Sequence, residues 1–219
     1  MAVLQTGLAK SLAEDYTIDQ SLRFNRADND ILSRTPATTT NRKTWTLSVW
    51  VKRGLLETGL QTIFGTAETG AAGGAGEDLI RIAWNASDQI AIHSDTDATF
   101  NVITTPVYRD PSSWYHLCIA CDTTQTTNTD RLKFYVNGTQ LTAFATTNWP
   151  PEDLLTAFNY AHTHRVGASY GDTAENLDGY LAEFYWIDGT QLTPSSFAET
   201  DEDTNQWKPI DASGLTFGT

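Results

Sequence analysis

The chain has few cations and no long apolar segment. Its 219 residues carry 14 Lys and Arg against 27 Asp and Glu, a formal net charge of −13. Such a surface repels the phosphates of nucleic acids and anionic lipids. No apolar run exceeds five residues, Leu117–Cys121, which is far too short to span a bilayer. We therefore expect no nucleic-acid partner and no membrane insertion.

Cysteine is nearly absent as well. Cys118 and Cys121 are the only two, and both lie in that apolar run. On a strand, positions three apart point to opposite faces, so this C-x-x-C can neither close a disulfide nor chelate one metal ion. A redox C-x-x-C also needs a turn and a helix start, which this run lacks. The sequence predicts two small buried thiols.

Helix formers are scarce, with five Lys and one Met, whereas Thr (34) and aromatic residues (24) are abundant. Thr is β-branched and favours strands. In residues 44–51 apolar and polar positions alternate, which predicts a half-buried antiparallel strand. With about ten to thirteen short strands and no crossover helices, we predict an all-β antiparallel sandwich. The other predicted strands are 22–25, 61–64, 79–84, 89–93, 98–103, 114–121, 131–136, 139–144, 164–168 and 179–187.

Turn signals fix some connections. Asn137-Gly138 tolerates the positive φ angles of a two-residue type I′ turn and predicts a hairpin. One short helix is predicted near Thr193–Glu199, with Pro194 in its first position. Residues 1–16 show no alternation and are predicted to form an amino-terminal arm. Residues 17–219 then form a single domain.

Several segments resemble a known family. Thr44–Arg53, Trp114–Leu117, Phe134–Gly138 and Gly179–Glu183 are similar to strands of the concanavalin A-like, laminin G-type jelly rolls. Within that superfamily the chain resembles domains of structural proteins of tailed bacteriophages, such as tail fibres, appendages and head decorations. The segments that carry this resemblance are Ser33–Pro36, Tyr185–Phe197 and Trp207–Pro209. The resemblance covers roughly residues 17–219 and implies one more strand after Thr219.

The resemblance implies a virion structural protein that is not an enzyme. We expect a lectin-like jelly roll, displayed as a fibre, appendage or capsid decoration, that binds host-surface glycans. Its arm would contact other virion proteins, and phage fibres suggest a homotrimer. The first ten residues have no basic segment followed by an apolar one, so no secretory signal is expected. The protein would then be made in the host cytoplasm and released by lysis.

Calcium is the metal that the resemblance implies, bound at rim loops. Asp172, Glu175, Asn176 and Asp178 offer oxygen ligands, although the D-x-[DN]-x-[DN]-G order is missing. A solvated acidic loop is the alternative interpretation of the same residues.

Sugar binding needs aromatic faces that stack on pyranose rings and polar groups that hold hydroxyls. Aromatic residues in predicted loops near polar residues are therefore the candidates, whereas others, such as Trp45, Phe134 and Phe184, are expected in the core. Loop aromatics also anchor neighbouring subunits, which is the alternative role. The candidate carbohydrate-binding residues are Trp84, Trp149, Tyr160, Tyr170, Asp172 and Asn176.

Two other functions share this fold: a glycan-degrading hydrolase, and a purely architectural virion domain without a ligand. A retaining glycosidase needs two carboxyl groups about 5 Å apart. Glu183 and Asp188 are five positions apart and are predicted on opposite faces, and Glu199–Glu202 follow the short helix. We therefore predict no catalytic residues.

Two short motifs suggest chemistry that their context does not support. Gly167–Gly171 matches G-x-S-x-G, but every His precedes Ser169 and the next residues are loop-like, so we predict a glycine-flanked turn. His162 and His164 have a spacing that suits Zn²⁺ only with further ligands. We expect solvent-facing histidines.

Overall fold

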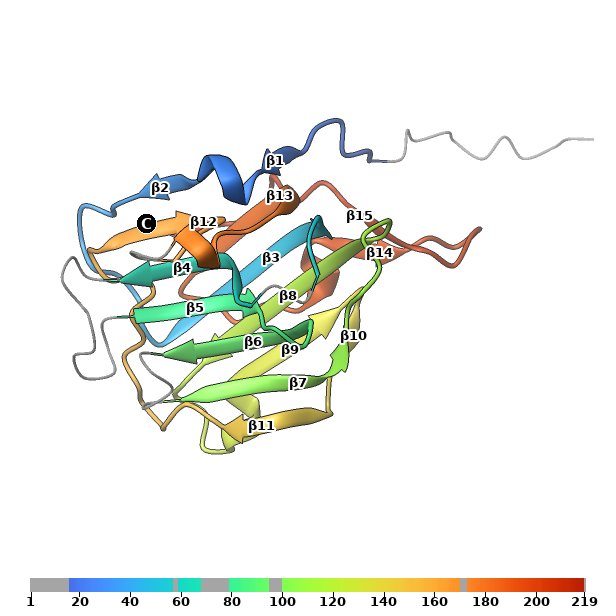
Figure 1. Ribbon diagram of the computed structural model, residues 1–219. Helices are drawn as coiled ribbons and strands as arrows, with labels where there is room; N and C mark the ends of the chain where they lie inside the picture. The colour runs from blue at the N-terminus through green and yellow to red at the C-terminus, as the bar shows by residue number, and fades with distance from the viewer. Residues whose placement is uncertain (1–15, 57–58, 68–78, 95–99, 170–172, 219) are drawn as a thin grey trace, which may run out of the picture.

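The computed structural model describes residues 16–56, 59–67, 79–94, 100–169 and 173–218. Two antiparallel sheets lie face to face in it, and a small third sheet packs outside one of them (Figure 1). This confirms the predicted all-β antiparallel sandwich. The arm predicted at 1–16 falls almost wholly outside the described residues.

The longest strands of the first sheet lie in its interior, where each has a partner strand on both sides. Its order is β1 (Leu22–Phe24), β13 (Gly179–Asp188), β3 (Thr44–Arg53), β8 (Trp114–Asp122), β9 (Leu132–Val136) and β10 (Thr139–Gln140).

The second sheet contains the predicted 79–84 and 89–93 hairpin. Its order is β11 (Phe144–Asn148), β7 (Asn101–Val107), β6 (Gln89–Ser94), β5 (Leu79–Trp84), β4 (Gln61–Ala67), β12 (Thr163–Val166) and β2 (Leu32–Arg34). The third sheet pairs β14 (Ala198–Thr200) with β15 (Trp207–Pro209).

Apolar side chains from both sheets fill the space between them. Trp45 on β3 is fully buried and stacks on Trp186 of β13, with ring centroids 5.0 Å apart. Phe134 is also buried, and Phe184 packs against the same cluster. The predicted core role of these aromatics is confirmed.

The prediction of a half-buried strand at 44–51 is wrong, because both faces of β3 are covered. Thr46 and Ser48, on the face expected to meet water, are 0% and 1% exposed. The segment after β13 covers this face, and Thr46 Oγ1 donates to Thr190 O at 2.7 Å. Alternation in the sequence could not reveal this cover, since short polar side chains suit a buried face whose hydrogen bonds are satisfied.

The turns follow the predicted chemistry more closely than the helix does. Asn137 and Gly138 have φ angles of 47° and 78°, as a type I′ turn requires. The returning strand β10 is only two residues long, because the chain crosses to the second sheet as β11. The predicted helix near Thr193–Glu199 is reduced to one 3₁₀ turn, η5 (Pro194–Ser196). The other 3₁₀ turns described are η1 (Arg26–Asp28), η3 (Asn128–Asp130) and η4 (Thr173–Glu175).

The two thiols lie as predicted. Cys121 belongs to the core between the sheets, whereas Cys118 packs with Phe197 on the outer face of the first sheet. Both are buried and unpaired. Among the described residues, no helix has the length and apolar character needed to cross a membrane.

Candidate functional site

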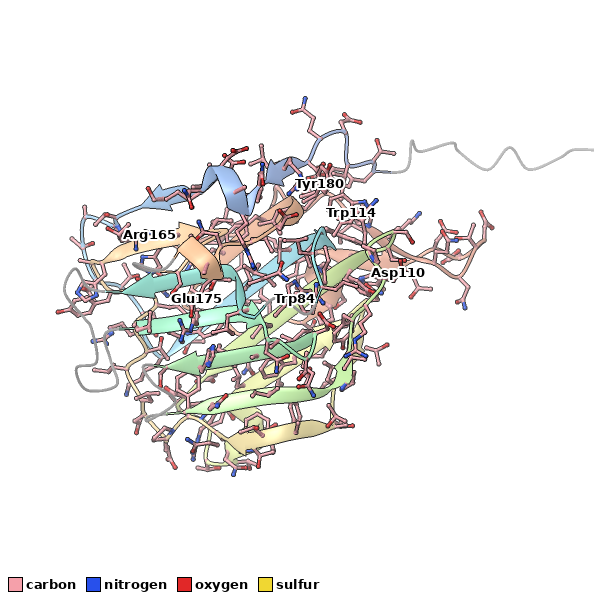
Figure 2. The ribbon with its side chains drawn as sticks, in the orientation of Figure 1. Trp84, Asp110, Trp114, Arg165, Glu175 and Tyr180 are labelled. Carbon is pink, nitrogen blue, oxygen red and sulfur yellow. The ribbon has the colours of Figure 1, made fainter. Side chains whose placement is uncertain are left out.

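Three tryptophans gather on the outer face of the first sheet. Trp50 on β3, Trp114 on β8 and Trp207 on β15 line a pocket of about 410 Å³, here called the tryptophan pocket. It lies at the end of the sandwich where the third sheet packs, and Figure 2 shows Trp114 there. Ala182 of β13 pairs with Trp50 in the sheet and supplies a small side chain to the same pocket.

A buried histidine holds two of these rings. Trp50 stacks on the imidazole of His116, its cross-strand partner, with centroids 5.0 Å apart. Trp207 Nε1 donates a hydrogen bond to His116 Nδ1 at 2.9 Å. The other imidazole nitrogen, Nε2, lies 2.8 Å from Ser48 Oγ. One side chain thereby joins β3, β8 and β15.

Ser48 and His116 resemble a nucleophile and its base, but their hydrogen bonds exclude that role. An indole nitrogen can only donate, so His116 Nδ1 must accept and Nε2 carries the proton. Nε2 therefore donates to Ser48 Oγ and cannot take the hydroxyl proton. Burial lowers the pKa of His116 to about 4, which keeps the ring neutral at physiological pH.

The rim of the tryptophan pocket is polar. The segment that precedes β1 contributes Asp19, Gln20 and Ser21 on one side, and Lys208 of β15 lines the other. Lys208 Nζ forms an ion pair with Asp201 at 2.9 Å. Trp114 and Trp207 are half-buried, so ring surface and hydrogen-bonding groups are available together. This combination suits a ligand with an apolar face and a polar edge, such as a pyranose.

The sequence-predicted hairpin turn positions Trp207. A Cβ atom on Gly138 would lie 2.7 Å from the Trp207 ring, so the ring packs directly over the turn. In the sequence, Trp207 belongs to a segment that carries the family resemblance and is not among the predicted site residues. The available signal was Trp50, a large aromatic on the otherwise polar face of its strand.

Trp84, the first sequence candidate, offers no face to a sugar. The ring is fully buried at the end of β5, and the Arg53 guanidinium lies 5.0 Å above it. Its neighbour Asn85 is a turn residue, and that polarity made the tryptophan look like a loop aromatic. Trp84 is therefore a core residue (Figure 2).

Trp149 and Tyr160 are each half-buried, and they are not brought together with the tryptophan pocket. Trp149 packs edge-on against Phe144 with centroids 5.0 Å apart, next to the core. Tyr160 lies under the Arg42 guanidinium, 4.5 Å from it. Neither lines the tryptophan pocket.

The other three candidates are close together in the sequence. Tyr170 and Asp172 lie outside the described residues. Asn176 is 3% exposed, its carbonyl accepts a hydrogen bond from Arg26 at 2.8 Å, and it forms a parallel bridge to Thr62. Asn176 therefore fastens the loop to β4 and does not present its amide to a ligand.

The described residues of the proposed calcium set do not fit a metal site. Glu175 forms an ion pair with Arg81 at 2.6 Å, and Asp178 forms one with Arg23 at 2.9 Å. Each carboxylate is held by its own arginine (Glu175 is labelled in Figure 2). In the part of the chain that the structure describes, no group of three His, Cys, Asp or Glu could hold a metal ion.

The expectation of solvent-facing histidines is wrong for His164, which is 7% exposed. Its Nε2 accepts from Asn159 N at 3.1 Å, and its Nδ1 donates to His162 O at 2.9 Å. Because β12 is covered on its core face, this imidazole packs beside Phe64. Both nitrogens are occupied by the backbone.

A second cleft, of about 560 Å³, opens between β2 and the end of β13 and is here called the edge cleft. Asn159 forms hydrogen bonds with two polar groups of this cleft. Its Oδ1 accepts from Trp186 Nε1 at 2.7 Å, and its Nδ2 donates to Asp188 Oδ1 at 2.8 Å. Glu183 lies at a β-bulge and accepts a hydrogen bond from Tyr185 on the outer face, whereas Asp188 lines the edge cleft. These two carboxylates lie on opposite faces, as predicted.

The comparisons agree with this architecture. The sequence profile of the concanavalin A-like lectin/glucanases superfamily matches residues 26–196. No curated protein sequence matches the chain.

Among solved structures, the heptameric SAP-like pentraxin from Limulus polyphemus aligns with a TM-score of 0.53 and 13% identity, over 88% of this chain and 100% of the pentraxin. NanB sialidase from Streptococcus pneumoniae aligns at 0.54 and 15% identity, over 84% of this chain and 29% of the sialidase. Domain 4 of the arabinanase AbnA from Geobacillus stearothermophilus, solved with arabinotriose, aligns at 0.51 and 21% identity, over 71% of this chain and 65% of that one. At these identities the likeness is one of fold.

Proposed function

The chain belongs to the concanavalin A-like lectin/glucanases superfamily, and from that premise we propose that it binds host-surface glycans, without cleaving them, as a lectin-like module of a tailed-bacteriophage structural protein. The fold itself is lectin-like. The glycan site that we propose is the tryptophan pocket.

The observation that carries the proposal is the convergence of Trp50, Trp114 and Trp207 beside a polar rim. Tryptophan stacks on the apolar face of a sugar while amide, hydroxyl and carboxylate groups hold its hydroxyls. A pocket of about 410 Å³ is the size of small-ligand sites. The His116 hydrogen bond and ring stacking hold two of the three rings in place before a ligand arrives, which lowers the entropic cost of binding.

The virion part of the proposal is supported by the resemblance of Ser33–Pro36 and Tyr185–Phe197 to phage structural proteins. A fibre, appendage or capsid decoration carries many copies of a domain, and repetition turns weak sugar contacts into strong attachment. We include a homo-oligomer, with a trimer as the expected state, and contacts with other virion proteins. Detection of the chain in purified particles, together with its mass in solution, tests this part.

Binding without catalysis is supported by the arrangement of the described acidic groups. Asp188 pairs with core-facing Trp45 and lines the edge cleft, whereas Glu183 lies at the β-bulge and is not part of the described lining, so the two do not flank one glycosidic bond in that cleft. The buried Ser48 and His116 pair has its proton on the wrong nitrogen for a nucleophile's base. Release of sugar from any glycan by the purified protein would contradict this part.

A glycan array probed with the purified chain, with and without calcium, tests the binding. Trp114→Ala should weaken glycan binding about thirtyfold, since a tryptophan at the centre of a binding site contributes roughly 2 kcal/mol or more. Trp149→Ala is the matched control, because it removes the same ring outside the pocket and should leave binding unchanged.

Three results would count against the proposal. Equal loss in both variants would mean that the pocket is not the site. Loss of glycan binding only in Trp149→Ala would place the glycan site at the loop aromatics that the sequence suggested. A folded protein that binds no glycan would favour the architectural role.

A further inference from the structure

The tryptophan pocket has little positive charge to offer a ligand. Among its described lining residues the charged side chains are Asp19 and Lys208. Lys208 Nζ is 2.9 Å from Asp201 and 3.8 Å from Glu199, so two carboxylates already share its charge. The positive charge of the ammonium group is therefore already offset before a ligand arrives.

Two further cations lie near the pocket but outside its lining. Lys52 of β3 is the cross-strand partner of Trp114 on β8, but it does not line the pocket. Arg23 of β1 pairs with Asp178 at 2.9 Å and lies 5.2 Å from the Tyr180 ring, again outside the lining. No described arginine contributes to the wall, so the two-pronged contact by which proteins hold carboxylates is missing there.

Apart from the charged pair, the polar side chains of the wall are neutral and suited to hydroxyls. Gln20 and Ser21 can donate and accept, and Asp19 can accept from two hydroxyl groups at once. An acidic sugar would bring its carboxylate toward Asp19 and toward the carboxylates that surround Lys208. Like charges at such distances repel, and desolvating the sugar carboxylate without a partner adds a further cost.

We propose that the tryptophan pocket selects uncharged hexoses, plain or N-acetylated, and rejects sugars that carry a carboxylate, such as sialic and uronic acids. This inference rests on the proposed function. It separates the chain from its sialidase structural neighbour, whose likeness is confined to the fold.

The test is a binding titration of the full chain with two matched sets of oligosaccharides, one ending in neutral or N-acetylated hexoses and the other in sialic or uronic acid. Each is repeated between about 0.05 and 0.5 M salt, a range over which exposed charge interactions are largely screened. We expect the neutral set alone to bind, with an affinity that salt changes less than about twofold.

Asp19→Lys replaces a wall carboxylate by an ammonium group on the exposed segment before β1, and it should let the acidic set bind several-fold better than to the unmodified chain. Glu202→Lys changes the net charge equally on the exposed β14–β15 connection and should not. Equal gains in both variants would overturn the assignment of selectivity to the pocket.

Two other outcomes separate this inference from the proposed function. Salt-sensitive binding of the acidic set by the unmodified chain, lost in Trp114→Ala, would overturn the inference and leave the glycan-binding function standing. No binding of either set by the folded protein would overturn both.

Discussion

Trp207 Nε1 and His116 Nδ1 lie 2.9 Å apart, and this hydrogen bond fixes both the shape of the tryptophan pocket and the protonation state of its buried histidine. The donor is on the third sheet and the acceptor on the first, so the bond also fastens the C-terminal cover to the sandwich. Its strength depends on a neutral imidazole, because a protonated His116 has no lone pair to accept with.

We expect stability to fall with acidification between about pH 6.5 and pH 4. His116 has a pKa of about 4 in the folded protein because of its burial, against about 6.5 when unfolded. On acidification the unfolded chain therefore binds the proton before the folded chain does. The stabilisation that neutral His116 gives the folded protein is fully present above pH 6.5 and is lost as the pH falls toward 4. The shift corresponds to roughly 3 kcal/mol.

Denaturant unfolding at a series of pH values measures this loss. His116→Asn keeps an acceptor for Trp207 and does not titrate, so its pH slope should be smaller than that of the unmodified chain. Identical slopes would show that other groups cause the acid sensitivity. Glycan binding by the folded protein should decline only as the pH falls to about 4 and below, where the folded His116 ring takes up its proton and releases Trp207.

Gly138→Ala should damage the turn and the site together. Gly138 has a φ of 78°, which is strained for any residue that carries a Cβ atom, and the new Cβ would lie 2.7 Å from the Trp207 ring. Gly59→Ala is the control, since Gly59 has φ of 91° with nothing within 4 Å. It should cost about 1 to 2 kcal/mol from strain alone, and Gly138→Ala should cost more and also weaken glycan binding. Equal losses of stability in the two variants, with glycan binding intact, would contradict the close contact between the turn and the Trp207 ring.

Asp88→Asn should destabilise the protein by about 3 to 5 kcal/mol, because it leaves buried Arg53 without its counter-charge. The two side chains are fully buried and 2.8 Å apart. Asp153→Asn is a matched control: both aspartates have φ near 60°, but Asp153 pairs with Lys43 at the surface. Its cost should stay below about 1 kcal/mol. Thermal or denaturant unfolding measures the destabilisation of each variant. A similar destabilisation in both would contradict this prediction.

Cys118 and Cys121 should resist alkylation in the folded protein. Burial raises the pKa of both thiols well above its usual range, so little thiolate forms and no reagent reaches it. Mass spectrometry after iodoacetamide treatment should find no modification under native conditions and two modifications in denaturant. Rapid native labelling of either thiol would show that its cover opens readily.

Much of the fold was predictable because its signals are local. Alternation in residues 44–51, the Asn137-Gly138 turn and the spacing of the two cysteines each depend on neighbours within a few positions, and the structure confirms the strand, the hairpin turn and the opposite faces. The candidate site was predicted less well. Trp84 looked like a loop residue because Asn85 follows it, and only the packing of β5 shows that its ring is buried.

The sequence by itself determined that this acidic chain folds as an antiparallel all-β sandwich, since strand periodicity and turn residues act along the chain. Only the tertiary structure decided where a ligand fits. Trp50, Trp114 and Trp207 are separated by 64 to 157 positions and meet because β15 folds over the face that Trp50 and His116 share. No local pattern encodes that meeting, because the contacts that hold β15 there join residues far apart in the sequence, such as Trp207 and His116.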